Sequence, residues 1–215
     1  MTLVPCGASA PIIFDLDDTL IESFPTYARL HQRVAGELGW AVPQRDALIT
    51  YHQTWEETLQ ALWPGLDIAA FMQRYDEIAE DHPYPAIAGA QATLATLRAA
   101  GHSLWIVTKR TRRRLDARMR SAGLDPAAFD GIFPAEDQPA LKPDPACFAP
   151  VWRALGGQDA RAVYVGDRDE DRRAAEGARI RFIAVLTGPE VARGFPGDLP
   201  PQHVVPSVAV LPQRL

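Results

Sequence analysis

The chain of 215 residues lacks the features that mark secreted, membrane-spanning or nucleic-acid-binding proteins. It has two cysteines, Cys6 and Cys147, and no C-x-x-C pair, so no disulfide framework is indicated and a cytoplasmic location is expected. No apolar run is long enough to span a bilayer, and we expect neither an export signal nor a membrane partner. The net charge is -5 and the densest basic run, Arg112-Arg113-Arg114, is short, so no nucleic-acid partner is expected.

Lysine is also scarce, because Lys109 and Lys142 are the only two against twenty arginines. A lysine ammonium is a compact point charge, whereas an arginine side chain ends in a planar fork. The choice of lysine at position 142 therefore suggests a point-charge role. Taken alone, Lys142 is better explained as a surface lysine before a helix.

What is present is an ordinary globular composition, with 47% apolar and 23% charged residues. Residues 23–81 show helical periodicity, including a capping pattern at Thr54–Glu57. From residue 83 onward, short apolar runs alternate with helical segments. The expected strands are 12–14, 104–107, 131–133, 162–165, 181–185 and 203–205. The expected helices are 27–38, one from about 43, 54–62, 67–81, 91–100, 112–122, 145–155 and 171–178.

This alternation predicts an α/β fold with a Rossmann-like parallel sheet flanked by helices. The core would comprise residues 1–19 and 84–215, and residues 20–83 would form an inserted all-helical cap. Ligands of open parallel sheets bind beyond the carboxyl ends of the strands. Since the insertion leaves from that edge, we expect it to cover the binding site.

The first expected strand, 12–14, runs directly into Asp15, Asp17 and Asp18. Clustered carboxylates do not end a strand inside a core, so this is expected to be the strand's exposed carboxyl end. Two like charges about 4 Å apart repel by roughly 4 kcal/mol at an effective dielectric near 20. A divalent cation would offset this repulsion, and oxygen ligands favour Mg2+. The alternative is a solvated acidic turn.

Three other segments carry polar residues at a predicted strand end or loop. These are Val107-Thr108-Lys109, Leu141-Lys142-Pro143-Asp144-Pro145 and the acidic stretch from Val165-Gly166-Asp167 to Asp171. Each has a structural explanation, since Thr108 suits a helix N-cap and acids suit a helix start. Their convergence at one sheet edge is what favours a reactive site.

With the first motif, these segments resemble, in order and spacing, the haloacid dehalogenase (HAD) superfamily in its branch with a small helical cap. The resemblance covers residues 12–188. Within the superfamily, the chain is similar to phosphoglycolate phosphatases in particular. It implies that Asp15 is the nucleophile, which forms an aspartyl-phosphate, and that Asp17 is the general acid and base. It further implies that Thr108 donates to a phosphoryl oxygen and that Lys142 places its charge beside Asp15 and the phosphate.

The same resemblance implies that Mg2+ is held by Asp15, the backbone carbonyl of Asp17 and Asp167, with Asp171 completing the metal site. On the substrate side it places Asp18, Thr108, Lys109 and Lys142. The chain departs from the common family pattern at two of these positions. Asp18 stands where glycine is commoner, and Lys109-Arg110 replaces a commoner Asn-Lys pair, so both departures bear on the identity of the substrate more than on the type of reaction.

The implied activity is Mg2+-dependent hydrolysis of a small phosphorylated metabolite by a monomer or homodimer. Asp17 argues against a dehalogenase, and a cap without lysine argues against a phosphonatase. A β-phosphoglucomutase-like phosphotransferase and a catalytically idle binding module remain as alternatives. The cap residues available to recognise the leaving group are Tyr27, His31, Arg45, His52 and Trp55, with His31 expected at the surface and Trp55 equally suited to core packing.

Overall fold

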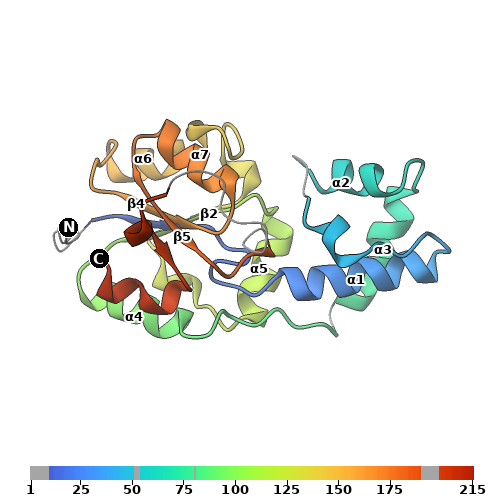
Figure 1. The fold of residues 1–215 in the computed structure, drawn as a ribbon. Coiled ribbons are helices and arrows are strands. Elements are labelled where there is room, and N and C mark those ends of the chain that lie inside the picture. Colours follow the sequence, from blue (N-terminus) through green and yellow to red (C-terminus); the bar gives the residue numbers. More distant parts are fainter. Residues whose placement is uncertain (1–9, 51–53, 80, 190–198) are drawn as a thin grey trace. The chain divides into compact units, whose positions relative to one another are not determined.

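The computed structural model describes residues 10–50, 54–79, 81–189 and 199–215 (Figure 1). The chain divides into two compact units, of which one ends at Glu22 and resumes at Pro85. The other unit runs from Ser23 to Tyr84. These breaks lie within three residues of the boundaries expected from the sequence, at 19/20 and 83/84.

The first unit is built on a parallel sheet, which has six strands in the described part of the chain. The strands are β1 Ile12–Phe14, β2 Leu104–Val107, β3 Gly131–Phe133, β4 Val163–Gly166, β5 Arg181–Val185 and β6 Val204–Val205. Their order across the sheet is β3-β2-β1-β4-β5-β6. Each matches a strand expected from the sequence. Strands of a parallel sheet are covered on both faces, so their sequences are short apolar runs that can be recognised. The expected α/β class is confirmed.

Four α-helices of this unit are described, and they begin and end close to the expected positions. They are α4 Ala90–Ala99, α5 Arg112–Ser121, α6 Ala149–Leu155 and α7 Asp169–Gly177. The expected continuous helix over 145–155 is wrong at its start, because a 3-10 turn, Pro145–Phe148, precedes α6. Pro150 explains this break, since it has no N–H for the carbonyl four residues earlier and its ring crowds that carbonyl.

Side chains of the sheet alternate between its two faces. Ile13, Trp105, Tyr164 and Phe182 belong to the core cluster on the face that α6 and α7 cover (Figure 1). Helix α4 and the C-terminal 3-10 turn Val208–Gln213 lie on the opposite face (Figure 1). Strand β1 pairs with β2 on one side and β4 on the other, so its carboxyl end is flanked by two neighbouring strand ends.

The second unit is helical wherever it is described, with α1 Phe24–Glu37, α2 Trp55–Leu62 and α3 Ile68–Ala79. Helix α2 begins with the expected capping box, in which Thr54 Oγ1 accepts from Glu57 N (3.1 Å) and the Glu57 side chain accepts from Thr54 N (3.4 Å). The helix expected from about residue 43 is wrong, because only a 3-10 turn, Arg45–Leu48, forms there. Side chains elsewhere in this unit bond the carbonyls of Ala41 and Pro43, which holds the preceding segment in non-helical geometry.

The surface position expected for His31 is also wrong, because its side chain is fully buried. Trp55 Nε1 donates to His31 Nε2 (2.8 Å), so the ring proton sits on Nδ1, which donates to the carbonyl of Tyr27 (2.7 Å). The Tyr75 ring lies edge-on at 5.2 Å between centroids. Tyr27 and His31 are four residues apart and so share one face of α1, but this spacing alone is compatible with a surface or an interior position. His52 lies outside the described residues.

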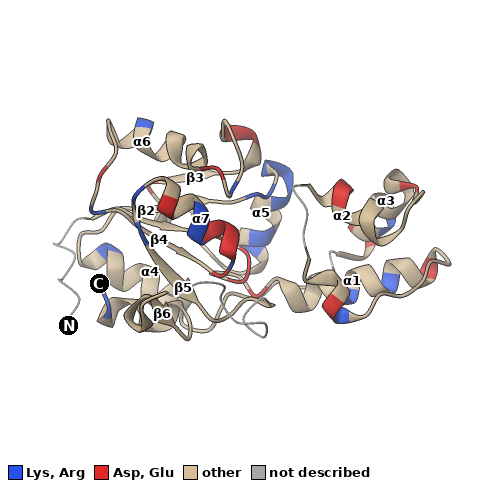
Figure 2. Cartoon of the chain, turned by 45° about the horizontal axis from the view of Figure 1, so that its top comes forward, with Lys and Arg blue, Asp and Glu red and all other residues tan. Residues whose placement is uncertain are grey.

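Charged side chains are spread over both units, with acids at the start of α7 and arginines along α5 (Figure 2). Within that arginine run, Arg112 pairs with Asp137 (2.5 Å), and its backbone N–H donates to Glu136 (3.1 Å). Among the helices that the structure describes, none combines the length and apolar character needed to cross a membrane.

Candidate active site

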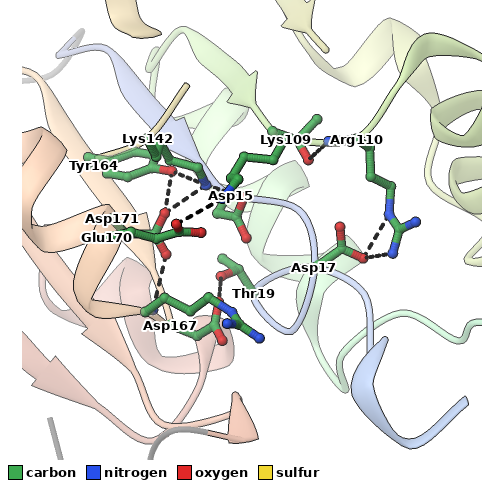
Figure 3. A network of polar contacts seen from close by, with 12 residues as sticks. Asp15, Asp17, Thr19, Lys109, Arg110, Lys142, Tyr164, Asp167, Glu170 and Asp171 are labelled. Carbon is green, nitrogen blue, oxygen red and sulfur yellow. Dashed lines mark hydrogen bonds and ion pairs between the residues drawn. The ribbon is translucent and has the colours of Figure 1, made fainter. Parts of the chain in front are cut away.

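Polar side chains from neighbouring strand ends meet at one edge of the sheet (Figure 3). Asp15 follows β1, Thr108 follows β2 and Asp167 follows β4, while Lys142 comes from the loop before the 3-10 turn Pro145–Phe148. Parallel strands end on the same edge, so the position of β1 between β2 and β4 brings these residues together. The exposed fraction is 6% for Asp15 and no more than 2% for the other three.

Lys142 makes three charge-assisted hydrogen bonds (Figure 3). Its Nζ donates to Asp15 Oδ1 (2.6 Å), to Asp171 Oδ1 (2.7 Å) and to the Tyr164 hydroxyl (2.9 Å). An ammonium has three protons, so the chain itself accepts all of them. Asp15 is anchored as well, because its backbone N–H donates to Val165 O (2.9 Å) and so continues the pairing of β1 with β4. The first acid and the lysine of the sequence motifs therefore form a fixed pair.

Tyr164, in β4, is a site residue that the sequence analysis missed. Its hydroxyl donates to Asp171 Oδ1 (2.8 Å) while accepting from Lys142. A signal was present, because a tyrosine inside a fully buried strand needs a partner for its hydroxyl. Gly166 lies two residues on, on the same face, and a Cβ there would stand 2.5 Å from Asp171 Oδ2. The missing side chain at Gly166 leaves the space that Asp171 occupies.

Asp167 is fully buried and only partly satisfied by the chain. Thr19 Oγ1 donates to its Oδ1 (3.4 Å), but its Oδ2 has no hydrogen-bond partner within the described residues. The backbone of Gly188 passes so close that a Cβ there would collide with Oδ2. A buried carboxylate oxygen without a donor is costly unless a cation or water satisfies it.

The electrostatics of the site reflect this burial. The pKa of Asp15 is raised to about 7, chiefly by burial, which outweighs the opposing effect of the Lys142 ammonium, and the carboxylates of Asp171 and Asp17 contribute to the rise. Burial likewise raises the pKa of Asp167 well above its usual value. At Lys142, burial acts to lower the pKa, but Asp15 and Asp171 outweigh it, so the pKa is raised and the lysine is charged. A cation bound at these carboxylates would favour their ionised form.

Three carboxylates are placed to share a cation. Asp15, Asp167 and Asp171 each offer an oxygen, and these oxygens lie within 4.8 Å of one another. The donor set contains only oxygen, which suits a hard ion such as Mg2+. Both oxygens of Asp171 already accept hydrogen bonds. Its Oδ1 accepts from Lys142 and Tyr164, and its Oδ2 accepts from the backbone N–H of Arg168 (3.0 Å). The unpartnered oxygen of Asp167 is the strongest sign that the residues fit a cation.

The side chain of Asp17 lies apart from these three carboxylates. Its Oδ1 accepts from Arg110 Nε (2.9 Å) and Nη2 (2.5 Å), and the two side chains are 27% and 18% exposed (Figure 3). The chain turns after Asp15, with the N–H of Ile21 donating to the carbonyl of Leu16 (3.0 Å). Arg110 is a second residue that the sequence analysis did not place in the site. Its position directly after Thr108-Lys109 was the available signal.

The three residues predicted to face the substrate besides Lys142 have different surroundings. Lys109 Nζ pairs with Glu170 in the first turn of α7 (3.0 Å), so its charge is engaged within this unit. Thr108 Oγ1 accepts from the N–H of Arg110 (3.2 Å), which leaves its own proton to donate. Asp18 has a left-handed backbone (φ 55°) and its side chain is buried.

Comparison with known proteins gives one consistent family. The family model for haloacid dehalogenase-like hydrolases matches residues 12–185. The phosphoglycolate phosphatase of Pseudomonas putida is 27% identical, over 94% of this chain and 78% of that protein. The phosphoglycolate phosphatase of Pseudomonas syringae pv. tomato is 30% identical, over 82% and 69%. The pyrophosphatase PpaX of Halalkalibacterium halodurans is 25% identical, over 87% and 89%.

Solved structures share the fold. CbbY from Rhodobacter sphaeroides, in complex with phosphate, has a TM-score of 0.71 at 24% identity, covering 94% of this chain and 96% of that one. A HAD-superfamily hydrolase from Geobacter sulfurreducens has a TM-score of 0.70 at 23% identity, covering 95% of each chain. Because the family model spans most of the sequence, including every strand-end motif of the site, this chain belongs to the haloacid dehalogenase-like hydrolase family.

Proposed function

We propose that this hydrolase is a Mg2+-dependent phosphatase that cleaves small phosphomonoesters through an aspartyl-phosphate on Asp15. The observation that carries the proposal is the placement of the Asp15 carboxylate, 2.6 Å from Lys142 Nζ and grouped with Asp167. A nucleophilic carboxylate needs a fixed orientation and nearby positive charge, and this arrangement supplies both. The naming of relatives as phosphatases supports the same reaction class.

In this reaction a carboxylate oxygen of Asp15 attacks phosphorus, forming a new P–O bond as the bond to the leaving oxygen breaks. Asp17 gives its proton to the leaving oxygen and then takes one from the water that hydrolyses the aspartyl-phosphate. Both carboxyl groups thereby return to their starting states. Arg110 holds one oxygen of Asp17. We assign the Thr108 hydroxyl, which accepts from the N–H of Arg110 and keeps its own proton, to donate to a phosphoryl oxygen.

Asp15 and Asp167 would hold Mg2+ through their carboxylates, and Asp17 would contribute its backbone carbonyl. The bound ion supplies charge neutralisation for the carboxylates and the phosphoryl group. We assign Asp171 to orientation of the site rather than to direct ligation, because the chain already donates to both of its oxygens.

The substrate class is a small phosphomonoester, with phosphoglycolate-like and sugar phosphates as the first candidates. The curated relatives include phosphoglycolate phosphatases and a pyrophosphatase, so a screen has to span both kinds of leaving group. Phosphate release with Mg2+ present should therefore be measured for glycolate, sugar, nucleotide and pyrophosphate substrates.

The decisive variant is Asp15→Asn, which keeps the size of the side chain and removes the nucleophilic oxygen's charge. We expect phosphate release to fall to the background rate, because no aspartyl-phosphate forms. Asp116→Asn is the matched control, since Asp116 is an exposed acid on α5 and its loss should leave turnover unchanged. Circular dichroism of both variants should match the unmodified protein.

Substantial hydrolysis by an Asp15→Asn sample of verified mass would rule out the covalent mechanism. Absence of hydrolysis by the unmodified protein across the whole substrate panel, with Mg2+ present, would contradict the phosphatase assignment itself.

A further inference from the structure

We infer that Gly188 is a positioning residue of the metal site, because its missing side chain leaves the room in which the Asp167 carboxylate sits. Gly188 lies in the segment that follows β5, which none of the four sequence motifs contains. The inference rests on the proposed function, since it concerns the binding of Mg2+ by Asp167. It adds to the site a strand end that contributes no side chain to the chemistry.

The first step is the space beside Asp167. A Cβ on Gly188 would lie 2.6 Å from Asp167 Cγ and 2.8 Å from Asp167 Cβ, and it would collide with Oδ2. Contacts between carbon atoms are optimal at about 3.5–4.0 Å, so these approaches are repulsive. Rotation of the carboxylate would relieve the contact with Oδ2 but not the contact with Cβ, whose place the backbone sets. A side chain at position 188 therefore displaces Asp167.

The second step is the backbone of Gly188, which does not itself require glycine. Glycine is usually needed where φ is positive. Gly188 is not among the glycines of the described residues that have a positive φ. The close approach to Asp167 is therefore what excludes a side chain at this position.

The third step is the fixed position of the segment after β5. The N–H of Leu186 donates to the carbonyl of Val205 in β6 (3.0 Å), and the Thr187 hydroxyl donates to the carbonyl of Asp18. These bonds tie the segment to the neighbouring strand and to the loop after β1. The segment cannot move away from Asp167 without the loss of one of them.

The fourth step is the environment of the Asp167 carboxylate. Thr19 Oγ1 donates to its Oδ1 at 3.4 Å (Figure 3), while Oδ2, beside Gly188, has no donor among the described residues. Both Gly188 and Asp167 are buried, so solvent does not reach this oxygen. A buried carboxylate oxygen without a donor gains most from a cation. The segment after β5 thus encloses Oδ2 and leaves it to the metal ion.

The test is the Mg2+ affinity of Gly188→Ala, measured from the dependence of Tm on Mg2+ concentration after treatment with EDTA. We expect the dissociation constant for Mg2+ to rise by about ten- to a hundredfold, as when other residues that orient a metal ligand are changed. In phosphate release, the Mg2+ concentration that gives half the maximal rate should rise by the same factor. KM for the substrate at saturating Mg2+ should stay within about threefold.

Gly131→Ala is the matched control. Gly131 begins β3, at the end of the sheet opposite the carboxylates, and its φ is not positive either. A Cβ there would lie 2.8 Å from Trp105 Cζ3, so the change should lower Tm through overpacking but leave the Mg2+ affinity unchanged. An unchanged Mg2+ affinity in Gly188→Ala would overturn the inference, as would an equal loss of affinity in Gly131→Ala.

A double-mutant cycle in EDTA gives a readout that needs neither metal nor activity. Gly188→Ala should lower Tm, and in the Asp167→Ala background the drop should be no more than about half as large, because Cγ and Oδ2 are gone. Equal drops in the two backgrounds would refute the steric basis of the inference. If Gly188→Ala does not fold, recovery of folded protein in the double variant supports the inference, and failure of both variants refutes it.

The proposed function and this inference can fail separately. If Mg2+ does not raise the Tm of the unmodified protein, the metal dependence of the proposed function fails. The cycle in EDTA then still decides whether Gly188 sets the position of Asp167.

Discussion

Asp18 shows how backbone geometry selects a residue within the site loop. Its backbone is left-handed, with φ of 55°, while its N–H donates to the carbonyl of Ile21 (2.6 Å) and its carbonyl accepts from the Thr187 hydroxyl. Glycine adopts this conformation freely, and aspartate is among the few other residues that tolerate it. The backbone requirement therefore explains the choice of an aspartate where the family more often has glycine. Whether the carboxylate also contacts the substrate is a separate prediction.

Two substitutions at Asp18 separate these roles. Asp18→Gly should leave the free energy of unfolding within about 0.5 kcal/mol, whereas Asp18→Val should lower it by about 1–3 kcal/mol, because a β-branched residue is strained at positive φ. Denaturant unfolding measures both. In the glycine variant, a raised KM without loss of stability would show that the carboxylate contacts the substrate. Equal destabilisation by the two changes would instead show that the side chain supports the fold.

At the scale of elements, helix α4 and the C-terminal 3-10 turn Val208–Gln213 pack closely because Gly89 has no side chain. Gly89 precedes α4 with φ of 84°, and a Cβ there would lie 2.8 Å from the Cβ of Ala209. Thr93 Oγ1 also donates to the carbonyl of Val208 (3.1 Å). The end of the chain is thereby held against one layer of the core.

Gly89→Ala and Gly101→Ala form a matched pair for this packing. Gly101 also has a positive φ (89°), but nothing lies within 4 Å of a Cβ there. Both changes should lower the free energy of unfolding by about 1 kcal/mol through backbone strain. Gly89→Ala should lower it by a further 1–3 kcal/mol or so through overpacking against Ala209. Equal losses in denaturant unfolding would mean that the C-terminal turn adjusts without cost.

At the scale of the whole molecule, the residues proposed to take part in the reaction all lie in one of the two units. Every residue assigned to the reaction belongs to the unit that ends at Glu22 and resumes at Pro85. The unit Ser23–Tyr84 has apolar contacts of its own, including the cluster of Phe24, Ala28, Leu48 and Ile49. The proposed metal and nucleophile sites therefore depend on the parallel sheet alone.

Mg2+ should raise the thermal stability of the protein, because it would bind buried carboxylates of the folded state only. At a hundredfold excess over its dissociation constant, a bound ligand adds about 2.7 kcal/mol, which corresponds to a rise in Tm of roughly 5–10 °C. EDTA should reverse the shift. Asp167→Asn should abolish it, while Asp116→Asn should retain it. A full Mg2+ shift in the Asp167→Asn variant would contradict the proposed role of Asp167.

The sequence by itself determined the class of fold and the segments that form the site. Strands of a parallel sheet are buried on both faces, so each appears as a short apolar run, and all six runs became strands. Polar residues directly after such runs had to meet at one edge, which is why Asp15 and Asp167 lie together. Lys142 reaches Asp15 from a loop. These inferences needed only local pattern and strand direction.

The tertiary structure alone decided which side chains pair. It gave Lys142 a third partner in Tyr164, placed Arg110 on Asp17 and engaged Lys109 with Glu170. It also buried His31, whose helical spacing to Tyr27 was compatible with a surface or an interior position. The physical reason is that periodicity reports which face a residue occupies, whereas a hydrogen bond depends on distances between segments far apart in the chain.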